Sequence, residues 1–170
     1  MTVSPTAISV LLQASPHELE QPSDSVQLTY EQRVRSRLAV QLASGRDATI
    51  ILPRGSVLRG GDRLRGDDGT VVEVVAAPEL LLEARVPDVT LLARAAYHLG
   101  NRHVAVEVRE RALRIARDPV LSSLLRQLGL NTEEIEAPFE PESGAYGHSH
   151  AHAPGAPAAA PRIHEFHHHE

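Results

Sequence analysis

The amino-acid sequence predicts an α+β fold, made of a small all-β domain, a mixed domain of strands and two helices, and a histidine-rich tail. Short runs that alternate polar and apolar residues occupy the first half of the chain, and two capped amphipathic segments occupy the second. The chain has 170 residues, which suffices for one ordinary domain or two small ones. We expect these parts to span residues 1–76, 77–146 and 147–170.

The first domain is predicted to be all-β because its apolar residues recur with a period near two. Short strands are expected at residues 27–30, 37–42, 49–52, 57–58 and 71–75. Gly60-Gly61-Asp62 and Asp68-Gly69 mark tight turns between strands, which is typical of a small sandwich or barrel. The arginines of this region are expected to lie on solvated strand faces, namely Arg33, Arg35, Arg37, Arg63 and Arg65.

The second domain is predicted from the start and stop signals of two helices. Asp88 is placed to cap the first helix and Gly100 to end it. Asp118 with Pro119 begins the second helix, and Gly129 ends it. Strands are expected around the helices at residues 80–86, 104–108, 112–116 and 134–139. The order β-α-β-β-α-β is that of a ferredoxin-like domain.

Composition excludes several classes of function. The chain has no Cys, which excludes thiol nucleophiles and thiolate metal sites, and its 17 basic residues are all Arg, which excludes Schiff-base lysines. A net charge of −5 with 3% aromatic residues argues against nucleic acid as a partner. Apolar runs are far shorter than the roughly 20 residues of a membrane span, and no signal peptide is evident. We therefore expect a cytoplasmic protein without membrane contact.

Histidine is abundant, with ten in the chain, and most of them lie in the predicted tail. Imidazole suits Ni²⁺, Cu²⁺ and Zn²⁺. The Ala- and Pro-rich stretch 153–161 cannot bury a core, so the tail is expected to be disordered and free to wrap an ion. An expression tag is the other interpretation of the terminal histidines, but their interrupted spacing favours a native metal-binding tail. The candidate ligands there are His148, His150, His152, His164, His167, His168 and His169.

Two further histidines flank the end of the first predicted helix. His98 lies beside Leu99, near the buried face, where a ligand role and a packed core histidine are equally expected. His103 is expected to open the next strand and to face outward. One imidazole binds a divalent ion poorly, but a twofold dimer would bring two His103 rings to one axis, where tail histidines could complete the shell.

The segment around these histidines resembles the signature of the urease accessory protein UreE family, a group of nickel metallochaperones. The resemblance rests first on Ala96-Tyr97-His98-Leu99-Gly100-Asn101-Arg102-His103-Val104. Further matching motifs cover nearly the whole chain: Leu52-Pro53-Arg54-Gly55, Asp118-Pro119-Val120-Leu121, Phe139-Glu140-Pro141-Glu142 and Gly144-Ala145-Tyr146. The resemblance implies a homodimer with a peptide-binding-like β domain and a ferredoxin-like domain. It also implies delivery of Ni²⁺ to apo-urease with the help of an accessory GTPase.

The resemblance further implies roles for individual residues. His103 corresponds to the family's metal ligand at the dimer interface, and the tail histidines correspond to its additional, variable nickel sites. The chain departs from some members at residues 115–119, which lack a His-x-His pair, and at Ala105, where Pro is frequent. A second metal site within the domain is therefore expected to be absent or built differently.

Taken together, these observations favour a non-enzymatic nickel carrier whose ion is held by His103 of both subunits and by tail histidines. Zn²⁺ or Cu²⁺ could also bind such a site, and metal could pair the dimers further. One alternative is a metal-dependent enzyme with His103 as a ligand, although no carboxylate lies at a matching spacing. The other alternative is a protein-binding scaffold whose histidine tail is incidental.

Overall fold

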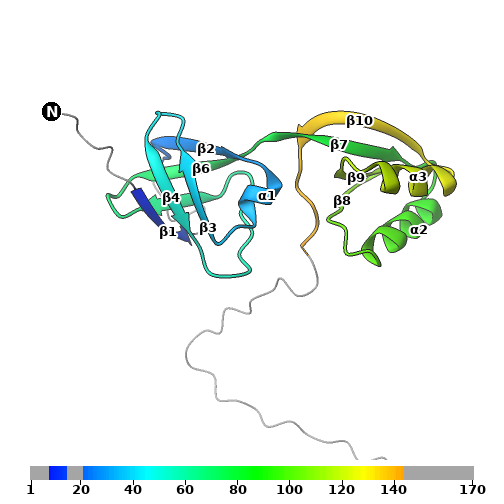
Figure 1. Ribbon diagram of the computed structural model, residues 1–170, viewed down its shortest axis with the longest axis horizontal. Helices are drawn as coiled ribbons and strands as arrows, with labels where there is room; N and C mark the ends of the chain where they lie inside the picture. Colours follow the sequence, from blue (N-terminus) through cyan, green and yellow to red (C-terminus); the bar gives the residue numbers. More distant parts are fainter. Residues whose placement is uncertain (1–7, 15–20, 144–170) are drawn as a thin grey trace, which may run out of the picture.

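The computed structural model describes residues 8–14 and 21–143, and these form an α+β structure in which strands predominate. The strands make two separate sheets, one in each half of the chain, and each sheet has its own buried cluster (Figure 1). No helix within the described ranges is long and apolar enough to cross a membrane.

The first sheet has six strands in the order β2-β6-β5-β1-β4-β3. β1 pairs in parallel with β4 and β2 in parallel with β6, whereas the remaining pairs are antiparallel. The elements are β1 (Ile8–Ala14), β2 (Asp24–Leu28), α1 (Tyr30–Arg33), β3 (Arg37–Gln41), β4 (Asp47–Ile51), β5 (Arg63–Gly66) and β6 (Val71–Ala76).

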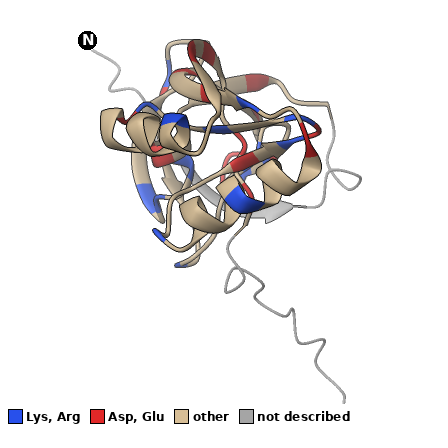
Figure 2. Ribbon diagram, turned by 90° about the vertical axis from the view of Figure 1, so that its right-hand side faces the viewer, with Lys and Arg blue, Asp and Glu red and all other residues tan. Residues whose placement is uncertain are grey.

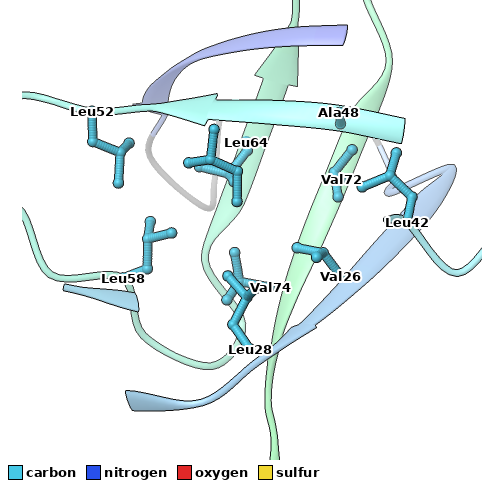
Figure 3. Packing of buried hydrophobic residues seen from close by; sticks show 10 residues of the cluster. Val26, Leu28, Leu42, Ala48, Leu52, Leu58, Leu64, Val72 and Val74 are labelled. Carbon is cyan, nitrogen blue, oxygen red and sulfur yellow. The ribbon is translucent and has the colours of Figure 1, made fainter. Parts of the chain in front are cut away.

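The core of this half forms because alternate residues of several strands turn to the same side of the sheet. Val26 and Leu28 of β2 are buried, with Val72 and Val74 of β6 beside them. Figure 3 shows these side chains converging with aliphatic residues of β4, β5 and the loops. Burial of this apolar surface is the main favourable term for folding of the half.

The sequence-based strands of this half need four corrections. β1 was not expected, β2 begins at Asp24 rather than residue 27, and β5 lies at 63–66 instead of 57–58. Residues 30–33 form the short helix α1, because Thr29 and Gln32 make a capping box. In this box the Thr29 N–H donates to Gln32 Oε1 at 2.9 Å and the Gln32 N–H donates back to Thr29 Oγ1 at 3.4 Å.

The second sheet has the order β10-β7-β9-β8, and all of its pairs are antiparallel. Its elements follow one another as β-α-β-β-α-β, as predicted. They are β7 (Pro78–Arg85), α2 (Val89–Gly100), β8 (Glu107–Arg109), β9 (Ala112–Ala116), α3 (Pro119–Gln127) and β10 (Asn131–Pro138). Leu82 and Ala84 of β7 join Leu99 of α2 and Leu125 of α3 in one buried cluster.

The predicted N-caps of both helices and the glycine stop of the second are confirmed, whereas Gly100 is the last residue of α2 and Asn101 is its C-cap. Asp88 Oδ1 accepts the Leu91 N–H at 2.8 Å, and Asp118 Oδ1 accepts the N–H groups of Val120 and Leu121 at 2.7 and 2.9 Å. Gly129 ends the α3 segment with a left-handed φ of 86°, which glycine adopts without the Cβ penalty of other residues.

β7 and β10 form a two-stranded ribbon that joins the two halves. All eight residues of β10 pair with β7 in one unbroken register, from Asn131 opposite Arg85 to Pro138 opposite Pro78. Only Ala77 separates the end of β6 from the start of β7. Figure 1 shows the ribbon running from the first half into the second. The chain enters the ribbon at Pro78 and leaves it at Pro138, and these two residues are paired at the same end of the ribbon.

Candidate functional site

His103 lies in the turn that follows α2, and its side chain is exposed. The turn is closed by the His103 N–H, which donates to the Gly100 carbonyl at 2.9 Å, and by the Arg102 N–H, which donates to Leu99. The expectation that His103 opens a strand is wrong, because pairing begins only at Glu107. Val104 and Val106 pack on the core cluster instead of joining the sheet.

The backbone of His103 is left-handed, with φ of 55°. Among the described residues, His103 is the only one other than glycine with a positive φ. A residue with a side chain pays about 1 kcal/mol or more of conformational free energy to adopt left-handed backbone angles, whereas glycine adopts them without this cost. Strained residues that persist in a fold cluster at functional sites. A histidine at a position that suits glycine is therefore an indication that the imidazole itself is used.

A surface cavity of about 590 Å³ lies beside this turn, with His103 in its wall. The two halves both contribute to it, because Tyr30 comes from α1 while Glu142 and Ser143 come from the chain after β10. The remaining wall is small or apolar, formed by Ala96, Gly100, Val104, Ala105, Val106 and Val108. Val108 in this wall is 43% exposed, and Tyr97, which follows Ala96 on α2, is 65% exposed.

His98 is half-buried in the last turn of α2. Its ring meets the Tyr97 ring edge-on, with the centroids 5.6 Å apart, and its carbonyl accepts a hydrogen bond from Arg102 Nη1 at 2.8 Å. The described part of the chain contains no group of three or more His, Asp or Glu residues placed to hold a metal ion. The described residues therefore supply His103 as an exposed donor without completing a metal site around it.

The predicted ligands of the tail lie outside the described residues. These are His148, His150, His152, His164, His167, His168 and His169. What the structure does place is the segment that leads to them, residues 139–143, which we call the strap. The strap follows β10 and ends at the wall of the His103 cavity.

The C-terminal half holds the strap by accepting two hydrogen bonds from backbone N–H groups of the strap, one at a carbonyl and one at a side-chain carboxylate. The Glu142 N–H donates to the Val106 carbonyl at 2.8 Å, three residues from His103. The Glu140 N–H donates to Glu107 Oε2 at 2.9 Å. Glu107 is buried and is itself paired with Arg109 and, at 3.5 Å, with Arg114. Figure 2 shows acidic and basic residues interspersed along the chain.

The N-terminal half holds the strap through Arg33, contrary to the expectation that Arg33 is solvated. Its side chain is 0% exposed, and its Nη1 lies 3.1 Å from both Glu140 Oε2 and the Leu58 carbonyl. Its Nη2 donates to the Phe139 carbonyl. The period-two pattern failed here because residues 30–33 form a helical turn that packs into the junction. Tyr30 on the same turn meets the buried Phe139 ring edge-on at 5.4 Å.

A second arginine, Arg59, holds the strap along its length. Arg59 Nη1 lies 3.1 Å from Glu140 Oε2 and 2.6 Å from the Pro141 carbonyl, and its Nη2 lies 2.9 Å from Ser143 Oγ. The Gly60 N–H donates to Glu140 Oε1 at 2.8 Å, and a Cβ at Gly60 would lie only 3.1 Å from that oxygen. We call Arg33, Arg59, Gly60 and Glu140 the clasp.

The other residues of the clasp lower the pKa of the Glu140 carboxyl group. Partial burial alone would raise the pKa of Glu140, but the Gly60 N–H and the two guanidinium groups outweigh it and hold the pKa below the usual 4.5. Sequence reasoning missed the clasp. Two signals for it were present: the Thr-x-x-Gln capping pattern before Arg33, and Glu140 within a motif shared with the resembled family.

Comparison with known proteins yields two adjoining family matches. The model described as UreE urease accessory protein, N-terminal domain, matches residues 8–77, and the corresponding C-terminal domain model matches residues 79–170. A urease accessory protein UreE from Dechloromonas aromatica (strain RCB) is 49% identical over 160 residues, which cover 85% of this chain and 91% of that protein.

Relatives with the same name in Burkholderia are longer than this chain. Those of Burkholderia lata and Burkholderia pseudomallei (strain 668) are 52% and 53% identical over 125 residues, or 74% of this chain. The matched region spans about three fifths of these relatives, 60% and 61% of their lengths.

Proposed function

Since the chain belongs to the UreE family of urease accessory proteins, we propose that it carries Ni²⁺ and delivers it to apo-urease while the urease metal centre is assembled. An accessory protein of this kind assists an enzyme and is not one itself. Its partners are the urease apoprotein and the accessory GTPase complex, and its place of action is the cytoplasm. Nickel as the cargo comes from the family, because an imidazole site would also accept Zn²⁺ or Cu²⁺.

The observation that carries the proposal is the position of His103. An exposed imidazole is held in a strained turn, beside apolar residues, and the described residues complete no metal shell around it. A homodimer would supply a second ligand, because a twofold axis beside His103 brings the same imidazole ring from each subunit to one ion. The exposed Val108 in the cavity wall offers apolar surface for that contact, and Tyr97 on α2 is a further exposed apolar side chain.

The tail histidines complete and exchange the ligands in this proposal. His148 follows Ser143 by five residues, a reach of up to about 17 Å in extended chain, and Ser143 borders the His103 cavity. Because ligating imidazoles must be neutral, and histidine has an ordinary pKa of about 6.5, metal should be released as the solution is acidified. Nitrogen ligands favour release of the ion to a partner over its permanent retention.

The domain organisation belongs to the same proposal. Residues 1–76 form a peptide-binding-like β domain, residues 77–146 a ferredoxin-like metal-binding domain, and residues 147–170 the tail. The two family models meet at residues 77 and 79, which supports the first boundary. The sheet order β10-β7-β9-β8 supports the ferredoxin-like assignment.

A nickel titration by calorimetry tests the role of His103. The tail is removed after Gly147, and the shortened protein is compared with its His103→Gly and His98→Ala variants. Glycine is chosen because it adopts the left-handed backbone of residue 103 without strain, so the variant should fold at least as well. We expect about one Ni²⁺ per two chains in the shortened parent and in His98→Ala, and loss of that site in His103→Gly.

Two outcomes would contradict the proposal. If His103→Gly keeps the tightest site of the shortened protein, His103 is not the ligand. If the intact chain binds no more nickel than the shortened one, the tail does not supply ligands.

A further inference from the structure

We propose that Glu142 is a ligand of the ion held by His103, so that each subunit contributes one imidazole and one carboxylate to the nickel site. The inference rests on the proposed function, because it takes His103 as a ligand of the cargo ion. It adds an oxygen ligand that comes from the strap, and both ligands belong to the part of the chain that the structure describes.

His103 and Glu142 lie in the wall of one cavity. Among the described residues that form this wall, they are the only histidine and the only carboxylate. Val106 also belongs to the wall, and its carbonyl accepts the Glu142 N–H at 2.8 Å, so the segments that carry the two ligands are joined beside the cavity. The cavity volume of about 590 Å³ admits a metal ion with several water ligands, since one water molecule occupies about 30 Å³.

The fold holds the backbone around Glu142 but makes no use of its carboxylate. Arg59 binds the residues on either side, through the Pro141 carbonyl at 2.6 Å and Ser143 Oγ at 2.9 Å. The Glu142 side chain is exposed, and its carboxylate makes no hydrogen bond or ion pair within the described chain. The carboxylate of Glu140, two residues earlier, is bound by the clasp instead. A group on an ordered backbone loses little conformational freedom when it binds an ion.

The charge of the ion favours a carboxylate in this cavity. Two neutral imidazoles leave the double positive charge of Ni²⁺ uncompensated, and most of the surrounding wall is apolar, so it cannot replace the water that the ion loses. Two Glu142 carboxylates, one from each subunit, balance this charge. The chain has no Cys, so a thiolate cannot do so. Mixed nitrogen and oxygen sites bind divalent first-row ions, Ni²⁺ among them.

A glutamate could also raise nickel affinity as a distant negative charge that never touches the ion. Two controls separate these roles. Glu136→Gln removes an equal charge from an exposed position on β10, outside the cavity wall. Salt provides the other control, because the screening length falls from about 10 Å in 0.1 M salt to about 3 Å in 1 M salt, which abolishes long-range attraction but not a ligand bond.

The experiment measures the nickel affinity of the tightest site by calorimetry, with the intact chain, at these two salt concentrations. The parent is compared with Glu142→Gln, Glu136→Gln, His103→Gly and the double variant His103→Gly/Glu142→Gln. Loss of a group that only orients a metal ligand usually lowers affinity about 10- to 100-fold, so loss of a ligand should cost no less. We expect Glu142→Gln to lower the affinity by about tenfold or more at both salt concentrations.

We expect Glu136→Gln to match the parent in 1 M salt, and we expect Glu142→Gln to have no effect once His103 has been replaced, because the shared site is then already lost. Parent-like affinity in Glu142→Gln would overturn the inference. A loss that disappears in 1 M salt would also overturn it, as would a loss of equal size in the His103→Gly background, since the two residues would then bind different ions. Failure of the proposed function is recognised separately: His103→Gly itself would bind nickel as tightly as the parent.

Discussion

Replacing Glu140 by Gln tests whether this carboxylate neutralises the buried Arg33. The substitution keeps the shape of the side chain and an acceptor for the Gly60 N–H, but it removes the negative charge that faces Arg33 and Arg59. Removing one partner of a buried ion pair costs about 3–5 kcal/mol, because the other charge stays buried without compensation.

The expected cost is lower here for two reasons taken from the structure. The Glu140 side chain is 31% exposed, so solvent already screens part of the pair, and Arg33 keeps the carbonyls of Leu58 and Phe139 as acceptors. We therefore expect Glu140→Gln to lower the free energy of unfolding by about 2 kcal/mol.

The assay is urea unfolding followed by circular dichroism, with Glu142→Gln as the matched control. Glu142 lies two residues further along the strap, is exposed, and makes no ion pair among the described residues. Its replacement should change the free energy of unfolding by no more than about 0.5 kcal/mol. If Glu140→Gln behaves like this control, the reasoning that the Glu140 charge compensates Arg33 is refuted.

Two further predictions concern acid stability and a helix cap. The lowered pKa of Glu140 means that its stabilising contribution is complete above the usual value of 4.5 and is lost as the pH falls through the lowered pKa. Melting temperatures of the parent should therefore fall more steeply than those of Glu140→Gln in acid, and parallel curves would contradict this. Asp118→Ala removes the acceptor of the Val120 and Leu121 N–H groups, and should cost about 1 kcal/mol in urea unfolding. Asp67→Ala in the exposed turn after β5 serves as its control, and an equal effect of both would contradict the capping role.

The second half of the fold could be predicted closely because its signals are local. Asp88, Asp118 and Gly129 act within one turn of their own positions, so sequence alone places both helices. The first half was less predictable. Its strands are short, and the short helix α1 is marked only by the Thr29–Gln32 capping box amid residues that also alternate like a strand.

The sequence identified His103 as a candidate metal ligand, but it did not reveal the turn and the clasp that surround it. His103 could be singled out from a motif, but neither its left-handed backbone nor the packing of Val104 and Val106 on the core could. The clasp depends on contacts between residues such as Arg33 and Phe139, which are 106 positions apart. Hydrophobic periodicity and helix-capping motifs describe only local structure, so they cannot reveal a contact between residues this far apart. Arg33 was therefore expected to be a solvated arginine.

The ribbon of β7 and β10 has a consequence for how the molecule could be taken apart. Pro78 and Pro138 are register partners, so the stretch from one to the other leaves the first half and returns to it at nearly the same point, about 5 Å away. Residues 78–138 are therefore topologically a cassette that could be cut out, or grafted into a surface hairpin of another protein, with a very short connection. The strap follows this cassette in sequence and is held by both halves, so removing the cassette would break its hydrogen bonds to Val106 and Glu107 and leave those to Arg33, Arg59 and Gly60.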